Sequence, residues 1–599
     1  MSDVPSHLPQ VGFASERNQA LPVASPSVSP RSGHTRVRLA SVCTALALTL
    51  GGGLAGCGSS SPSGTSADPA AVVPSAAVLY AGATVRPTDT QATAALAAGK
   101  ALTHEADPYL RLLATLQTPG APQLNYAKEL APWLGPHAGI FLTSLSGSSS
   151  TLLSLIKQGL LGGTASSAFP FGSGGAQGAI VLDTTNVAKA RSFLQALAKH
   201  AGAHNTTYKG LAYQSTSEGV SFGVVKRFAV IGSEAGMHSV IETADGSSSL
   251  ARASGYTKLL AAGPSDALGH VYTGTPGSAP ASTTESSSGL LSLLAGSRQA
   301  NISLVPAARS LTIDADTLTT ASTGGGAGLL ATDPEGAKAL AELPGESWLA
   351  VGLGHLSTSI DEDVQGLESL SSLASTLGGA GPESTAGLSL GGLLQGLLMP
   401  LGELGADTPQ ARKDFASWMG SGAVFAGGAS LLELKGAVVI SSKDPALSRA
   451  AVSKLAAALR KAGGSVTPTK IAGTEAAAVA RLSGLPVVLD IADGRDATGQ
   501  TKFVIGIGEA SVQAALKPTS TMAGSATAEA AAGALGEGTQ PSIILNLPTL
   551  LSLLEGVGLT EAPSISKFLP YLRSLTTLAG GGHSLGNEVE RFKLVLGLQ

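Results

Sequence analysis

One short segment of the chain matches a pattern that hydrolases use to present a nucleophile. Residues 387–391 read Gly-Leu-Ser-Leu-Gly, which has the form G-x-S-x-G. In acyl-transfer enzymes this serine stands on a sharp turn between a strand and a helix. Residues 378–385, just before it, include three glycines and a proline and are typical of a loop. We therefore interpret Ser389 as a chance match, and a serine hydrolase is the least favoured function.

Two histidines have a spacing that could place them on one helix face as metal ligands. His200 and His204 are four residues apart, but Gly202 lies between them and no third ligand is nearby. We predict a solvated helix end there instead. The Gly99-Lys100 pair lacks the other residues of a phosphate-binding loop, and the glycine clusters lack the dinucleotide-binding spacing. We accordingly predict no catalytic, cofactor-binding or metal-binding residues, and a protein that is not an enzyme.

A cysteine near the N-terminus has the surroundings of a lipid attachment site. Residues 54–57 read Leu-Ala-Gly-Cys, after an apolar run at 39–54 that is too short to span a bilayer comfortably. Arginines precede the run, at positions 31, 36 and 38. This arrangement resembles the signal peptide and lipobox of bacterial lipoproteins. The resemblance implies cleavage before Cys57, lipidation of its sulfur with acyl chains such as palmitate, and a place on the extracytoplasmic face of the cell membrane.

The remaining composition limits the chemistry further. The chain has only two cysteines, and Cys43 lies inside the predicted signal. A chain that begins at Cys57 would have no disulfide and no free thiol for catalysis. The net charge is −4, and no basic stretch suggests a nucleic-acid partner.

The sequence contains four blocks that recur in the same order. They are 74–82 and 344–352, 133–141 and 418–425, 178–181 and 436–439, and 229–232 and 503–506. The sequence separation between the two members of a pair varies only by the length of insertions. This regularity predicts two tandem, divergent copies of one unit. The equivalent tryptophans, Trp133 and Trp418, fit buried core positions better than a binding platform.

Within each copy, a helix stands among short strand-like runs. We expect helices at 91–116, at 187–201 with Asn186 as its cap, and at 445–462 with Asp444 as its cap. Strands are expected at 77–85, 138–142, 179–182, 211–214, 220–225 and 228–231, with counterparts at 476–480, 485–490 and 503–507; the units close at 310–315 and 592–598. This pattern predicts an α+β fold with a largely antiparallel sheet plus helices.

The predicted organisation has six parts. They are a disordered leader (1–30), the signal peptide (31–56), a flexible tether (57–73), a first unit (74–320), a linker (321–343) and a second unit (344–599).

Several of these blocks resemble a known family. The opening at 74–87, the W-L-G block at 133–143, the G-A-I-V-L-D-T-T block at 178–185 and the Y-K-G-L-A-Y block at 208–213 are similar to the uncharacterised bacterial family catalogued as domain of unknown function 3352. Many of its members are exported or membrane-anchored, in agreement with the lipobox. The resemblance implies no activity, substrate or catalytic residue.

Two functions remain open. The favoured one is a non-catalytic envelope lipoprotein that binds or scaffolds another envelope protein. The alternative is a carrier or sensor of an apolar ligand, such as a lipid or glycolipid, held between the two units. The low-charge segments 152–161, 290–294 and 393–398 motivate the alternative, although ordinary core helices would explain them too.

Overall fold

The structure is a computed structural model, and it describes about three fifths of the chain. The described residues are 66–104, 126–144, 171, 176–274, 299–318, 334–357, 415–430, 433–482, 487–556, 560, 566 and 569–599. The lipid attachment residue Cys57, the serine pattern at 387–391 and the low-charge segments 152–161, 290–294 and 393–398 lie outside them.

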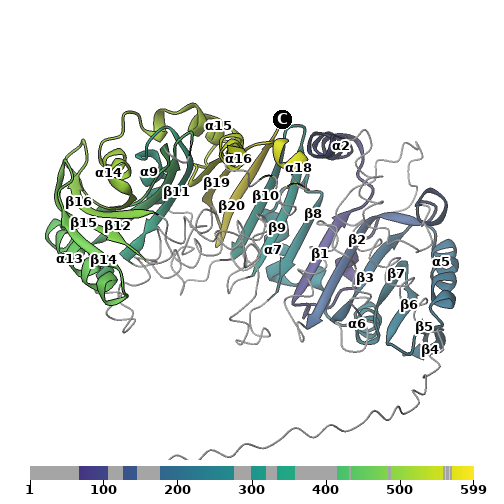
Figure 1. Cartoon of the computed structure of the whole chain (residues 1–599). Coiled ribbons are helices and arrows are strands. Elements are labelled where there is room, and N and C mark those ends of the chain that lie inside the picture. Colours follow the sequence, from purple (N-terminus) through teal and green to yellow (C-terminus); the bar gives the residue numbers. More distant parts are fainter. Residues whose placement is uncertain are drawn as a thin grey trace, which may run out of the picture.

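The described strands form one antiparallel sheet that runs through both halves of the chain (Figure 1). Ten strands come from the first half: β1 (Leu79–Thr84), β2 (Leu134–Ser144), β3 (Gln177–Thr184), β4 (His204–Tyr208), β5 (Leu211–Ser215), β6 (Val220–Val225), β7 (Phe228–Ser233), β8 (Gly269–Thr273), β9 (Ala300–Ala307) and β10 (Ser310–Leu318). Ten come from the second: β11 (Ser347–His355), β12 (Met419–Gly427), β13 (Lys435–Ser442), β14 (Ser465–Thr469), β15 (Thr474–Arg481), β16 (Val488–Arg495), β17 (Thr501–Ile507), β18 (Ile543–Asn546), β19 (Leu575–Gly586) and β20 (Val589–Leu598).

The two halves pair their strands in the same order. In the first half the order is β4-β5-β6-β7-β3-β2-β1-β8-β9-β10. In the second it is β14-β15-β16-β17-β13-β12-β11-β18-β19-β20. The halves join where β10 pairs with β20. The fold is therefore α+β, as the sequence predicts. An internal duplication remains our proposal, and the matching order supports it.

Helices cover both faces of the sheet. One face carries α6 (Glu234–Ala244), α7 (Ser254–Ala262), α9 (Pro334–Ala341), α14 (Gly508–Leu516) and α15 (Ala526–Leu535). The other carries α5 (Val187–His200), α13 (Pro445–Lys461) and α16 (Leu547–Gly556). Strand β20 shows that the faces continue across the junction, because Val589 packs with the first-half helices and Val595 with the second-half helices. Residues six apart in a strand face the same side.

Local sequence signals explain the best-placed helices. The Asn186 side chain accepts a hydrogen bond from the Lys189 backbone and caps α5. Asp444 caps α13 through the amides of Ala446 and Leu447. Both caps satisfy backbone groups that the first turn of a helix leaves free. The expected helices at 187–201 and 445–462 are confirmed.

Other expected boundaries need correction. The tether does not extend to residue 73, because Pro69–Ala71 form a 3-10 helix, η1, and Val73 is fully buried. The linker at 321–343 contains α9, whose Leu340 belongs to the core. Both segments cover apolar sheet positions that an isolated unit would expose. The helix expected at 91–116 is α2 (Asp89–Thr103), which ends where His104 adopts a φ of 56°.

At the junction of β10 and β20, charged residues line the face of the sheet that carries α7 and α15. Arg591 of β20 binds both carboxylate oxygens of Asp316 at 2.7 and 2.9 Å, and Asp316 has no exposed side-chain surface. Arg591 also donates to the last carbonyl of α7, from Ala262, and Lys593 donates to Leu535 at the end of α15. Cations at helix C-termini complement the helix dipole. The contacts of Arg591 thus join the two halves beyond their backbone hydrogen bonds.

Within the described part of the chain, Asp314 at this junction is buried without hydrogen-bond partners for both of its carboxylate oxygens. One carboxylate oxygen has no hydrogen-bond partner among the described residues, and burial raises its pKa despite the nearby charges of Arg591 and Lys593. Asp316 and Asp266 add to the rise. His270 of β8, separated from Asp314 by β9, carries no positive charge at neutral pH, since burial lowers its pKa to about 4.

The Asp314→Asn variant should therefore be more stable than the wild type at pH 8, by on the order of 1 kcal/mol. A raised carboxyl pKa gives the wild type its full stability below the ordinary value of 3.8, and that contribution is lost as the pH rises through the raised pKa. Urea unfolding at pH 4 and pH 8 measures the difference. An equal difference at both values would contradict this explanation.

Candidate functional site

Three neighbouring strands of the second half place polar side chains together on the face covered by α9 and α14. Ser441 of β13 lies directly opposite Lys502 of β17. Ser421 of β12 lies beside Ser441, where a register shift interrupts the pairing of these two strands. Val439 and Val504, two residues along, point into the core on the same face. These polar side chains therefore lie next to a filled apolar core.

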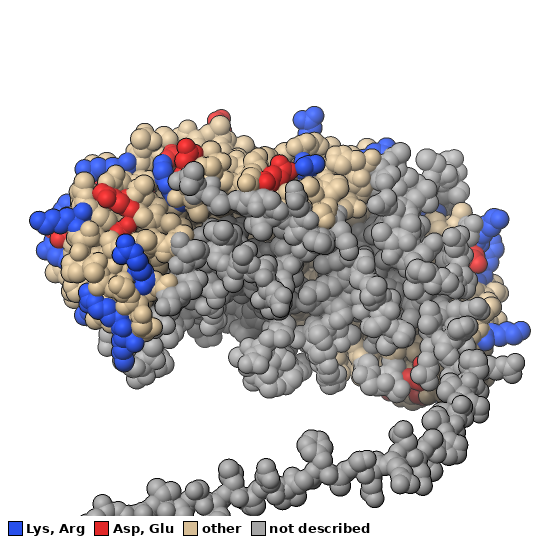
Figure 2. All heavy atoms as spheres, in the orientation of Figure 1, with Lys and Arg blue, Asp and Glu red and all other residues tan. Residues whose placement is uncertain are grey.

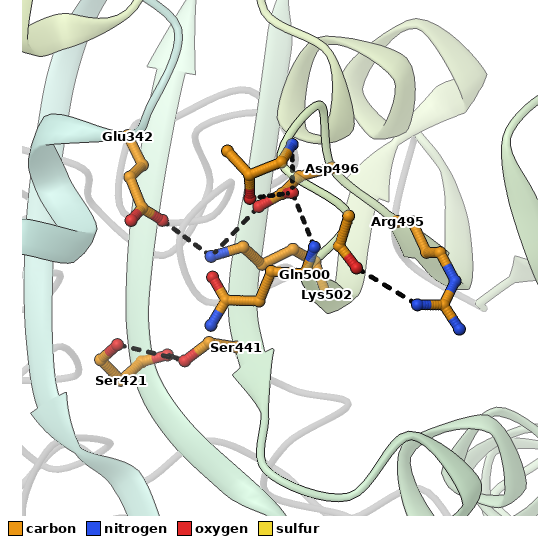
Figure 3. Close-up of polar contacts among 9 residues, drawn as sticks. Glu342, Ser421, Ser441, Arg495, Asp496, Gln500 and Lys502 are labelled. Atoms are coloured by element: carbon orange, nitrogen blue, oxygen red, sulfur yellow. Dashed lines mark hydrogen bonds and ion pairs between the residues drawn. The ribbon is translucent and has the colours of Figure 1, made fainter.

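Lys502 is the centre of this group. Its side chain is only 8% exposed, and its Nζ lies 2.7 Å from Glu342 Oε2 and 3.8 Å from Asp496 Oδ2 (Figure 3). Glu342 follows the end of α9, whereas Asp496 belongs to the turn between β16 and β17. The ammonium group therefore connects three separate elements.

Asp496 is held as a carboxylate. Thr498 donates to its Oδ1 from the amide and the hydroxyl, at 2.8 and 2.6 Å, and the Gln500 amide donates at 3.0 Å. Burial acts to raise the pKa of Asp496, but these hydrogen bonds and the charge of Lys502 outweigh it and hold the pKa below its ordinary value. The turn thus presents a fixed negative charge to Lys502.

The two serines bond to each other. Their hydroxyl oxygens are 3.1 Å apart, and the Ser441 hydroxyl donates to the Ser421 carbonyl at 2.8 Å. Among the described residues no histidine, carboxylate or lysine hydrogen-bonds to either hydroxyl. A serine nucleophile requires an adjacent base. These hydroxyls are arranged to donate or accept hydrogen bonds rather than to attack a substrate.

A cavity of about 140 Å³ opens between these groups and the elements above them. Leu343, Leu516 and Pro518 supply apolar walls, while Thr498 adds a further hydroxyl. An engineered cavity of about 150 Å³ holds benzene, so the space accommodates a molecule of roughly that size. The two carboxylates and one ammonium leave the site with a net charge of −1. This chemistry suits a small polar ligand that is neutral or cationic.

The first half has a different charged pair at the matching position. Asp183 of β3 lies opposite Phe228 of β7, as Ser441 lies opposite Lys502. The buried Asp183 forms an ion pair of 2.8 Å with Arg227 and accepts a hydrogen bond from the Ala67 amide. Burial raises the pKa of Asp183, although the Arg227 charge opposes the shift. The segment before η1 thus contacts this position in the first half.

The residues singled out from the sequence do not meet in a site. His200 ends α5, whereas His204 begins β4, so they share no helix face. His200 is exposed, and its Nδ1 lies 2.8 Å from the Ala196 carbonyl. Trp133 and Trp418 are 1% and 3% exposed. They are buried, as predicted, in the two cores on the face of the sheet that α5 and α13 cover.

The sequence did contain a signal for the Lys502 site. Lys502 is the only charged residue in the apolar strand at 501–507, and a charge in a buried strand needs partners. Glu342 could not be found in this way, because the composition of its segment, 321–343, predicts a linker. Asp496 lies in a turn, where aspartate is common for local reasons.

The fold and this site define an α+β protein with a small, partly open pocket, lined by apolar, hydroxyl and charged side chains, on a continuous antiparallel sheet. A family model described as protein of unknown function (DUF3352) matches residues 39–598. The match covers nearly the whole chain, and the protein therefore belongs to this family. No curated protein and no solved structure matches the chain. Among the described residues, no helix is long and apolar enough to cross a membrane.

Proposed function

We propose that the protein is an envelope lipoprotein, attached to the cell membrane through Cys57, that binds a partner without catalysing a reaction. The observation that carries this proposal is the Lys502 pocket. Its ammonium group is bound by two carboxylates and its serines are bound to each other. Such groups recognise a ligand by charge and hydrogen bonding. None of them is poised as a base or a nucleophile.

The pocket also links binding to the surrounding structure. Glu342, Lys502 and Asp496 belong to α9's end, β17 and the β16–β17 turn, so a ligand that bonds to one of them acts on all three elements. In the ion pair of Lys502 and Glu342, the Glu342 side chain is 45% exposed, so it is the member that a ligand can reach from solvent. A ligand ammonium or hydroxyl group could bond there while the buried Lys502 holds the carboxylate in place.

The Lys502→Met variant tests binding at this pocket. Methionine keeps the side chain's length but removes the charge, so the two carboxylates lose their shared partner. We expect native mass spectra of wild-type protein from host membranes to contain a discrete bound species that Lys502→Met lacks. Lys435→Met is the matched control, because Lys435 forms an ion pair with Glu346 outside the pocket, at 3.5 Å. Identical spectra for all three proteins would contradict the proposal.

A carrier of an apolar ligand is the second candidate, and one cavity favours it. A hollow of about 380 Å³ lies between α9 and α15, lined mainly by Ala337, Leu340, Ala528 and Ala532. Ligand pockets begin at about this size. The hollow belongs to the second half rather than to the junction between the halves. Organic extraction of the purified protein would distinguish the candidates: a stoichiometric, non-covalent lipid supports the carrier, and its absence supports the polar pocket.

A further inference from the structure

Two helices at matching places in the halves carry basic side chains and no acidic ones. Helix α5 follows β3 and α13 follows β13, and both cover the face opposite the Lys502 pocket. Their basic residues are Lys189, Arg191, Lys199 and His200 in α5, and Arg449, Lys454, Arg460 and Lys461 in α13. Figure 2 shows lysine and arginine side chains gathered at the two ends of the body, where Figure 1 places these helices. The whole chain, in contrast, has a net charge of −4.

Intramolecular contacts account for only some of the charges on α13. Arg449 forms an ion pair with Glu475 of β15, and Arg460 donates to the Val466 carbonyl at 2.9 Å. The dipole of the helix favours cations in its last turn, which also covers Lys461. None of these reasons applies to Lys454, an exposed residue in the middle of the helix.

The exposed surface of α13 combines these lysines with an apolar side chain. Leu447, Lys454 and Lys461 are seven residues apart, so they lie along one stripe of the helix. Leu447 is 44% exposed, the most exposed large hydrophobic side chain in the described part of the chain. Ala450 and Ala457 fill the stripe between them with small side chains. The apolar face of α13 is buried in the core, so this outer stripe can contact a bilayer only through its lysines, which anionic headgroups attract, and through the exposed Leu447.

We propose that this stripe of α13 docks on an anionic lipid bilayer, so that the second half lies along the membrane. The proposal rests on the membrane attachment proposed above, which supplies its occupant: the chain from Cys57 to Ser66 can span only about 30 Å. The first half, where Ala67 bonds to Asp183, is therefore held near the bilayer, and anionic lipids are complementary in charge to Lys454 and Lys461 of the second half. One acyl chain binds a membrane only weakly, and a basic patch on the protein strengthens that attachment.

Vesicle binding by the unlipidated chain tests this surface separately from the anchor. The full chain with Cys57→Ala is mixed with vesicles of phosphatidylcholine alone, or with 30% phosphatidylglycerol, at about 0.05 and 0.3 M salt. We expect stronger binding to the anionic vesicles, weaker at high salt. Adding Lys454→Glu and Lys461→Glu should lower binding to anionic vesicles roughly tenfold or more. The leader is present in every variant, so its contribution cancels in the comparison.

The matched control reverses two exposed lysines on the opposite face, Lys338 of α9 and Lys517 after α14. The Lys338→Glu/Lys517→Glu variant has the same net charge as the α13 variant and should bind like the Cys57→Ala parent. Equal losses in both variants would overturn the proposal, since they would reflect net charge only. It would also be overturned by equal binding to both vesicle types, or by binding to neither, which would leave α13 for a protein partner. Loss of lipid attachment at Cys57 in cells is measured separately, so the two failures are distinguishable.

Discussion

Replacing Cys57 with alanine is expected to abolish incorporation of labelled palmitate into the protein. The thiol of Cys57 is the atom to which the lipid would be attached, and alanine has no nucleophile to replace it. Cys43 is the only other cysteine, and it lies inside the predicted signal. Metabolic labelling in the host, followed by immunoprecipitation, measures the effect directly. The unlipidated protein should also leave the membrane fraction or be mislocalised.

A matched substitution separates lipid attachment from a general effect of losing a cysteine. The Cys43→Ala variant keeps the segment apolar and keeps residues 54–57 intact, so it should be labelled like the wild type. Palmitate retained in the Cys57→Ala protein would show that another group carries the lipid. Unchanged membrane retention would show that another part of the chain anchors it.

The second large effect concerns the junction of the halves. Replacing Asp316 with leucine should destabilise the fold by about 3–5 kcal/mol, because it removes the carboxylate that Arg591 bonds to and leaves the guanidinium largely buried with only Asp314 nearby, whose own pKa is raised by burial. Arg591 is only 13% exposed, and it bonds to Asp316 through two nitrogens. Removing its partner therefore leaves a desolvated charge between β10, β20 and the end of α7. Urea unfolding of Asp316→Leu against wild type measures the loss.

Two further variants define the cause of that loss. The double variant Asp316→Leu/Arg591→Met removes both charges and should be more stable than Asp316→Leu alone. Lys258→Ala breaks the exposed ion pair with Glu588, which also joins the halves, and should cost much less stability than Asp316→Leu because solvent screens exposed charges. A double variant as unstable as Asp316→Leu would show that packing, rather than the unpaired charge, causes the loss.

Elements fixed by neighbouring residues could be predicted from the sequence. The helices α5 and α13 begin where Asn186 and Asp444 cap them, since those side chains bond to amides two or three residues away. The strands at 179–182 and 503–507 are apolar runs bounded by polar turns, and they lie within β3 and β17. In each case the signal and the structure involve the same few residues.

The strand order could not be predicted in this way. The pairing of β10 with β20 joins residues such as Ser310 and Gly597, which are far apart in the sequence, and nothing local in either strand specifies the other. The charged junction and the Lys502 site could not be predicted for the same reason, since their residues are also far apart in the sequence. Lys502 meets Glu342 only because α9 packs over β11 and β12, which brings its end close to β17, a placement that depends on the whole second half.

The boundaries of the units failed for a related reason. Residues 66–73 and 334–343 are mostly small or polar, with a few valines and leucines, and this composition predicts a tether and a linker. In the structure, Val73 and Leu340 are buried against the sheet. Whether an apolar residue in such a segment is buried depends on the surface that it covers. Strands distant in the sequence form that surface.

The intact mass of the protein extracted from host membranes tests the central claim most directly, because membrane attachment through Cys57 underlies both the proposed function and the docking of α13. The account predicts the mass of a chain that begins at Cys57, increased by a diacylglyceryl group and any further acyl chain on that residue. A peptide containing residue 57 should carry the whole increase. An unmodified chain, or one that still contains residues 31–56, would contradict the account.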